Sequence, residues 1–320
     1  MELKGNLEYW KISLKNPEPI VDEYYISDEI IVDDKKLIKR IERLRDLITA
    51  YCVLLKKGEN LAEKILDEIY EIISDTDKIQ YTEFVAFWKT LDLSFSVFNK
   101  LQNQKIVLAK LLKEYCSRRK KLYDRLGYSN ITVQALYDIG ASRKKGTSGV
   151  IKIIGLAKEK FNLKKLSHFR KIEDVKIQKL GYFLPDSGDQ KLFRDFCKDF
   201  NIRYKFGDEH QGKLPDVVLK VGNHFLIIEA KHIKESGGAQ DKQIDEIIKF
   251  IKYSENSKSI HYLSFLDGIY FNNFISPPKS SKVYRQKQEI EEHLKNNPNN
   301  FFLNTAGIIC LFQDLKKFLE

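Results

Sequence analysis

The chain has 320 residues, of which 42% are hydrophobic and 12% aromatic, enough apolar material for one large or two ordinary domains and too much for a disordered chain. Its formal net charge of +10 fits a polyanionic partner, although many proteins are basic without binding nucleic acid. No apolar run reaches the roughly 18 residues that a membrane span needs, and no signal peptide opens the chain. We therefore expect a cytoplasmic protein without a membrane partner.

The cysteines lie far apart in the sequence, with no CxxC pair and no Cys/His pair at zinc-ligand spacing. They are Cys52, Cys116, Cys197 and Cys310. We expect them to be small buried hydrophobes in a reducing compartment.

Helical periodicity dominates the first part of the chain. Apolar residues recur at helical spacing in the segments 34–57, 60–73, 81–88 and 95–117. From residue 180 onward the pattern becomes mixed α and β. This change predicts an α+β fold with two domains, a mostly helical one over 1–165 and a mixed one over 166–320.

A basic loop flanked by glycines follows the helical segments. Residues 140–149 include Arg143, Lys144 and Lys145, together with hydroxyl side chains and little side-chain bulk. Such a loop suits a close approach to the phosphate backbone of DNA, and a simply solvated loop is the alternative. The turn is too long for a strict helix-turn-helix.

A β-hairpin is predicted after a helix over 189–200. Residues 217–221 and 225–228 are apolar, partly β-branched runs, and Gly222-Asn223 between them is a two-residue turn. With this turn as the loop, Asp216 faces Glu229 in the class of pair whose side chains lie closest. Lys231 lies two residues beyond Glu229 and therefore on the same face.

Two carboxylates that face each other ordinarily destabilise a sheet, so either both point into water or a cation lies between them. The apolar neighbours of Glu229 place this strand end near a core. Hard oxygen ligands suit Mg²⁺, and Lys231 adds a positive charge that could stabilise a phosphate or orient a water. The pattern favours metal-assisted phosphodiester hydrolysis over a surface hairpin with ordinary charges.

The motif also resembles a known family. Pro215-Asp216, the hairpin spacer and Glu229-Ala230-Lys231 look like the PD-(D/E)xK motif of the restriction-endonuclease-like nuclease superfamily, over roughly residues 186–275. The segment 236–243, SGGAQDKQ, is similar to the residues after this motif in several type II restriction endonucleases. The resemblance implies an α/β/α domain with a mixed central sheet.

The resemblance further implies roles for these residues. Asp216, Glu229 and the backbone carbonyl of Ala230 would be ligands of one or two Mg²⁺ ions, and Lys231 would be the catalytic lysine. From the preceding helix Gln190 or Asp195 could join the site, although charge on a helix surface is the alternative for both.

The segment after the motif predicts a DNA contact. Gly237 and Gly238 form a flexible turn before a helix over 240–253, and backbone amides at such a helix start could meet a phosphate. Gln240 and Gln243 project from its first turn and could contact DNA, with ordinary solvation as the alternative. Further strands are expected over 259–265 and over 303–311, the latter before a final helix.

Together these features predict a Mg²⁺-dependent, sequence-specific endonuclease that cleaves double-stranded DNA as the restriction enzyme of a restriction–modification system. The helical domain would serve in DNA recognition or dimerisation, and a homodimer follows from family analogy alone. The alternatives are a repair or junction-resolving nuclease of the same superfamily, a non-catalytic DNA-binding protein with a degenerate nuclease fold, and a helical scaffold with no DNA role.

Overall fold

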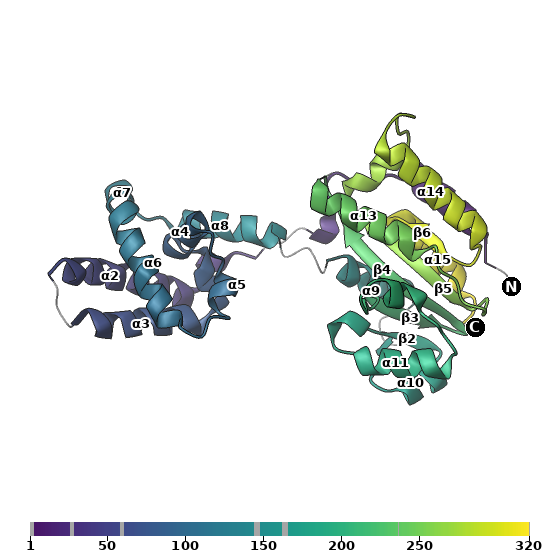
Figure 1. The fold of residues 1–320 in the computed structure, drawn as a ribbon, viewed down its shortest axis with the longest axis horizontal. Coiled ribbons are helices and arrows are strands. Elements are labelled where there is room, and N and C mark those ends of the chain that lie inside the picture. The colour runs from purple at the N-terminus through teal and green to yellow at the C-terminus, as the bar shows by residue number, and fades with distance from the viewer. Residues whose placement is uncertain are drawn as a thin grey trace. The chain divides into compact units, whose positions relative to one another are not determined.

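The computed structural model describes residues 3–25, 29–57, 61–143, 148–161, 166–235 and 237–319. The chain divides into two compact units (Figure 1). A sheet unit contains Met1–Ile26 and Lys145–Glu320, and a helical unit contains Ser27–Lys144. The predicted mixture of α and β structure is confirmed. None of the helices in the described ranges is long and apolar enough to cross a lipid bilayer.

The helical unit is built from amphipathic helices around one core. Its helices are α2 (Lys35–Lys57), α3 (Leu61–Asp75), α4 (Glu83–Trp88), α5 (Phe95–Phe98), α6 (Gln104–Arg118), α7 (Lys120–Leu126) and α8 (Asn130–Arg143). Short 3-10 turns lie at Ile31–Asp33, Asp77–Tyr81 and Lys89–Leu91. The apolar stripe of α2, which includes Leu44 and Ile48, packs in this core with Ile69 of α3 and Leu112 of α6. The predicted helical periodicity therefore corresponds to a buried face.

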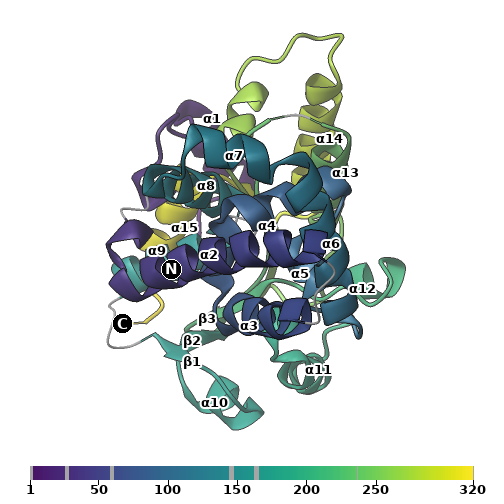
Figure 2. The same ribbon diagram turned by 90° about the vertical axis from the view of Figure 1, so that its left-hand side faces the viewer.

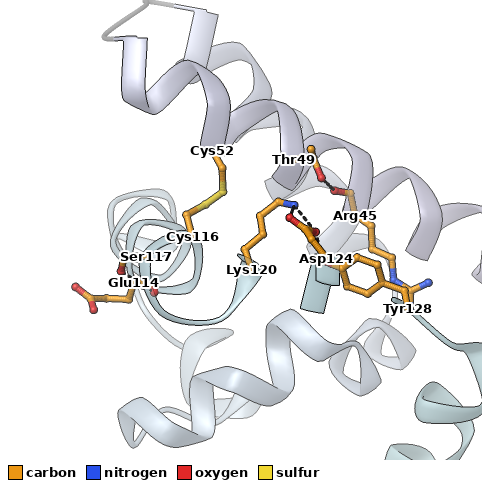
Figure 3. The surroundings of a disulfide bond; sticks show 9 residues. All are labelled: Arg45, Thr49, Cys52, Glu114, Cys116, Ser117, Lys120, Asp124 and Tyr128. Atoms are coloured by element: carbon orange, nitrogen blue, oxygen red, sulfur yellow. Dashed lines mark hydrogen bonds and ion pairs between the residues drawn. A yellow bond between two sulfur atoms is a disulfide. The ribbon is translucent and has the colours of Figure 1, made fainter. Parts of the chain in front are cut away.

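A disulfide joins α2 to α6 in the helical unit. The sulfur atoms of Cys52 and Cys116 are bonded, and their Cα atoms lie 5.8 Å apart (Figure 3). Next to the bond, the Nζ of Lys120 donates to Asp124 at 2.8 Å. The expectation that every cysteine is only a small buried hydrophobe is therefore wrong for this pair, because the fold brings together positions that are 64 residues apart.

The sheet unit contains a mixed sheet whose described strands follow one another in the order β1-β2-β3-β4-β5-β6. The strands are β1 (Ser167–His168), β2 (Leu180–Phe183), β3 (Val217–Val221), β4 (His224–His232), β5 (Ile260–Asp267) and β6 (Phe301–Leu303). β3 is antiparallel to both of its neighbours, β2 and β4. The other pairings, β1 with β2, β4 with β5 and β5 with β6, are parallel. Helix α10 (Ile172–Ile177) connects β1 to β2 and lies at this end of the sheet (Figure 2).

Helices cover both faces of the sheet, which gives three layers. On one face, Ile227 of β4 packs with α11 (Gln190–Asp199), α12 (Lys205–Glu209) and α13 (Gly238–Phe250). Helix α14 (Lys282–Asn296) extends this layer beside α13. On the other face, Ile228 packs with α9 (Ser148–Phe161) and α15 (Thr305–Lys316), and α1 (Asn6–Lys15) lies against α15 and β6. Because strand side chains alternate, Glu229 and Lys231 share the face of Ile227.

The compact units divide at residues other than the predicted boundary between 165 and 166. Helices α1 and α9 precede residue 166, yet both belong to the sheet unit. Tyr9 of α1 and Leu156 of α9 share one buried core with Leu226 of β4. An amphipathic pattern shows that a helix has a buried face, but it does not show which core that face joins.

The prediction of a strand over 303–311 is wrong for most of that range. The strand ends at Leu303, and the side chain of Asn304 accepts the N–H of Gly307 at 3.0 Å as the N-cap of α15. Ile308, Leu311 and Leu315 are buried at helical spacing. A short apolar run does not distinguish a buried strand from a buried helix, and here the capping asparagine was the informative residue.

Candidate active site

The candidate site stands at the end of the β3–β4 hairpin. Gly222 adopts a left-handed φ of 61°, as the predicted tight turn requires, and the ladder runs from Val221–His224 to Val217–Ile228. The hairpin and its register are thus confirmed. β4 then continues to His232 beside β5, with Glu229 paired to Ser264. The last residues of β4 therefore extend beyond the end of β3.

Asp216 occupies the place where β3 would have continued. It does not form the expected ladder pair with Glu229, because the ladder ends at Val217–Ile228 and the Asp216 N–H donates to the Ile228 carbonyl at 3.0 Å. Its Oδ2 instead accepts the N–H of Ala230 at 2.8 Å. The carboxylate thus satisfies a backbone amide that β3 no longer reaches. The Ala230 carbonyl points to the same side of β4 as this amide, since both groups of a strand residue face one neighbour.

Glu229 is fully buried, and two lysines hold one of its oxygens. Glu229 Oε1 lies 2.5 Å from Lys231 Nζ and 2.6 Å from Lys213 Nζ. Lys213 also contacts the carboxylate of Glu246 on α13. Glu229 Oε2 is buried and has no hydrogen-bond partner among the described residues.

The charges of the cluster act on one another. Burial, together with the nearby Glu229 carboxylate, raises the pKa of Asp216 to about 6, although Lys231 and the amide of Ala230 oppose this shift. For Lys231, burial alone lowers the pKa, but the carboxylates of Glu229 and Asp216 outweigh it, so its pKa lies above the ordinary value. The lysine therefore carries its positive charge at neutral pH.

The donor set of this cluster fits Mg²⁺. Asp216 and Glu229 supply hard carboxylate oxygens, and the Ala230 carbonyl lies on the Asp216 side of the strand. A buried acceptor without a partner, such as Glu229 Oε2, calls for a ligand. When all these groups are charged, the three acids Asp216, Glu229 and Glu246 outnumber the two lysines, Lys213 and Lys231. The cluster then has a net negative charge.

No described interaction brings the predicted DNA-contact residues to Asp216 and Glu229, which we call the acid pair. Gly237 precedes α13, where its carbonyl accepts the N–H of Asp241 at 2.7 Å, and Gly238 is the first residue of the helix. Gln240 and Gln243 are exposed on its first turns. Arg143 is the last residue of α8, and Lys144 and Lys145 lie outside the described residues. A DNA contact by any of these stays a prediction.

Sequence reasoning missed Lys213 and Glu246. Lys213 lies three residues before Asp216, and α13 carries Glu246 between the buried Ile244 and Ile247. Their proximity in the fold, not a pattern in the chain, makes them part of the site. Of the two expected contributors from α11, Gln190 lines a pocket together with Lys213, and Asp195 is a half-buried residue that is not among the lining residues.

A second polar cluster lies on the opposite face of the β4 end. The carboxylate oxygens of Glu18, Asp22 and Asp267 lie within 4.8 Å of one another, a spacing that could hold a metal ion. However, Lys152 Nζ already lies 2.5 Å from Asp22 and 2.7 Å from Asp267. His232 Nδ1 lies 2.7 Å from the other oxygen of Asp267. This cluster therefore fastens α9 and the segment around residues 18–22 to the sheet.

No protein-family model, curated protein or solved structure matches the chain. The resemblance to PD-(D/E)xK nucleases therefore rests on the motif residues. Their arrangement, a buried glutamate and a half-buried aspartate with a charged lysine at a strand end, is chemically suited to bind a divalent cation beside an anionic substrate.

Proposed function

We propose that this chain is a Mg²⁺-dependent endonuclease that cleaves double-stranded DNA at specific sequences, as the restriction enzyme of a restriction–modification system. The observation that carries the proposal is the buried Glu229 carboxylate, held by Lys231 at 2.5 Å beside Asp216, with its second oxygen unpartnered among the described residues. A restriction-endonuclease-like identity of the three-layered sheet unit is part of the same proposal.

The acid pair and Lys231 have distinct roles in this proposal. Asp216, Glu229 and the Ala230 carbonyl would hold Mg²⁺, which would supply polarisation of the phosphate and a lower pKa of a bound water. Lys231 stabilises the negative charge that develops on the phosphate oxygens in the transition state. Because the pKa of Asp216 is about 6, this carboxylate is mostly ionised at neutral pH and becomes protonated in mild acid.

The partners belong to the proposal as well. Double-stranded DNA fits the net charge of +10, and the helical unit would read the sequence or form a homodimer on a symmetric site. We also propose a cytoplasmic location. Reducing conditions there would favour the thiol form of Cys52 and Cys116 over their disulfide.

Digestion of a sequenced plasmid with the purified full chain, with and without Mg²⁺, tests the proposal. We expect discrete fragments that require Mg²⁺, and their ends identify the sequence that is cut. Lys231→Ala should abolish cleavage and leave DNA binding largely intact, whereas Lys234→Ala, at an exposed lysine three residues further on, should cut normally.

Other outcomes of this digestion contradict the proposal in recognisable ways. Cleavage of branched or damaged DNA without cleavage of an intact duplex would indicate a repair or junction-resolving nuclease. Salt-dependent DNA binding without any cleavage would indicate a non-catalytic DNA-binding protein, and no DNA binding at all would remove a nucleic-acid role.

A further inference from the structure

A pocket of about 360 Å³ adjoins the acid pair. It lies between α11 and the segment 203–214, and Lys213 lines it. The same lysine bonds to Glu229 at 2.6 Å, so the pocket and the acid pair share this side chain. A group bound in the pocket would therefore lie next to the proposed cleavage site.

The charge of the pocket favours an anion. Arg194, Arg203 and Lys213 line it, and Asp208 supplies the carboxylate among the lining residues. Arg194 and Arg203 are exposed, and neither forms an ion pair with any residue that the structure describes. Two arginines that are free to bind suit a phosphate group, because the planar guanidinium donates two parallel hydrogen bonds to its oxygens.

Tyr204, which also lines the pocket, has a buried hydroxyl that bonds to no described group of the fold. The side chain is only 7% exposed, and its hydroxyl has no hydrogen-bond partner in the part of the chain that is described. Burial and the charge of Glu229 raise the pKa of Tyr204, so the hydroxyl stays protonated and can only gain by donating to an acceptor. A buried hydroxyl left unpaired costs stability, and such groups call for a ligand.

The fold also holds Tyr204 in one position. Its backbone is left-handed, with φ 41° and ψ 52°, which is strained for a residue with a side chain. Its ring packs edge-on against Phe193 at 4.9 Å and stacks on Tyr262 at 6.2 Å. At Gly207 a Cβ atom would lie 2.8 Å from the ring, so only glycine leaves room for it. Strain and close packing thus preserve a hydroxyl that the fold itself does not use.

We propose that this pocket binds a phosphate group, with Arg194 and Arg203 on its oxygens and the Tyr204 hydroxyl as a neutral donor to it. Lys213 would turn from Glu229 to the phosphate as the site fills. The inference rests on the proposed function in one respect: the phosphate is then one that neighbours the scissile phosphate on the same DNA strand.

Thermal unfolding of the full chain with inorganic phosphate, against chloride at equal ionic strength and without divalent cations, tests phosphate binding. A ligand that binds the folded state raises the melting temperature. We expect phosphate to stabilise the wild type, and Arg194→Gln with Arg203→Gln to remove the effect. Tyr204→Phe should melt no lower than the wild type without phosphate, yet bind phosphate about tenfold more weakly, as expected for one hydrogen bond to a charged group.

Tyr262→Phe is the matched control. Its hydroxyl is also buried but donates to Glu255 at 2.8 Å, so this variant should melt lower and keep its phosphate response. Undiminished phosphate binding by Tyr204→Phe or by the double arginine variant would overturn the inference.

A second arm distinguishes DNA from free phosphate. A short DNA duplex should protect Arg203 and Arg194 in the wild type from modification by a guanidine-specific reagent, and protection by inorganic phosphate but not by the duplex would overturn the assignment to DNA. Because neither arm requires cleavage, a chain that binds phosphate here but never cuts DNA would contradict the proposed function and leave the phosphate site standing.

Discussion

Lys213 Nζ lies 2.6 Å from Oε1 of the fully buried Glu229, and the same ammonium contacts Glu246. A lysine that neutralises a buried carboxylate stabilises the protein without a metal, but it also competes with any cation for that carboxylate. The pair therefore links the stability of the site to its proposed metal affinity.

Lys213→Gln should raise the affinity for a divalent cation about fivefold, because one unit of competing charge at a partly exposed pair is worth about 1 kcal/mol. Calorimetric titration with Mg²⁺ measures this change without any need for cleavage. The same variant should bind phosphate more weakly than the wild type, so the two affinities move in opposite directions. Lys234→Gln, at an exposed lysine, should change neither. An unaltered Mg²⁺ affinity in Lys213→Gln would show that Lys213 does not compete with the cation.

Asp216→Asn should make the metal-free protein more stable at neutral pH and abolish cleavage. The folded-state pKa of Asp216, about 6, lies above its ordinary value of 3.8, so folding favours the protonated acid. Wild-type stability should therefore fall as the pH rises from about 4 through 6, by about 3 kcal/mol at most. The asparagine can still accept from Ala230 and removes this loss.

Urea unfolding without divalent cations at pH 4, 6 and 8 measures the difference in the free energy of unfolding between Asp216→Asn and the wild type. The gain of the variant should vanish at pH 4, where the acid is protonated in the folded chain. Asp245→Asn is the control, because Asp245 is a more exposed acid on α13 that pairs with Lys282 at 3.4 Å. A gain of the same size in both variants, or one independent of pH, would show that burial of Asp216 is not its cause.

Lys152→Met should destabilise the sheet unit by about 3–5 kcal/mol, the range for removal of one partner from a buried ion pair. Lys152 is 2% exposed and lies between Asp22 and Asp267, whose charges would be left without their main counterion. Denaturant unfolding measures the loss. Lys160→Met on the same helix, where the lysine pairs with its neighbour Glu159, should change stability by less than about 0.5 kcal/mol. A small loss in Lys152→Met would mean that the carboxylates find another cation or a proton.

Reduction of the Cys52–Cys116 disulfide should destabilise the helical unit by about 4 kcal/mol. The bond closes a loop across a sequence separation of 64 residues, and its removal restores chain entropy to the unfolded state. Unfolding of the full chain with and without a thiol reductant measures this difference. The variant with Cys52→Ser and Cys116→Ser should match the reduced wild type and be insensitive to the reductant. Sensitivity that persists in the double variant would point to another oxidised group.

The sequence by itself determined the features that depend on neighbours along the chain. Gly222 supplies the left-handed turn, and the β-branched runs on either side of it select one register, so the hairpin could be derived to the residue. The same register placed Glu229 and Lys231 on one face near Asp216. Helical spacing likewise identified the buried stripe of α2.

Only the tertiary structure decided which distant groups meet. It brought Glu246 of α13 to Lys213, Cys52 to Cys116, and helices α1 and α9 to the sheet unit. It also ended β3 one residue before the expected pair, so that Asp216 bonds to the amide of Ala230 instead of facing Glu229. Periodicity and turn chemistry report how a residue is buried or how the chain bends, because those preferences act over a few residues. The choice of a partner across the fold depends on the packing of whole elements.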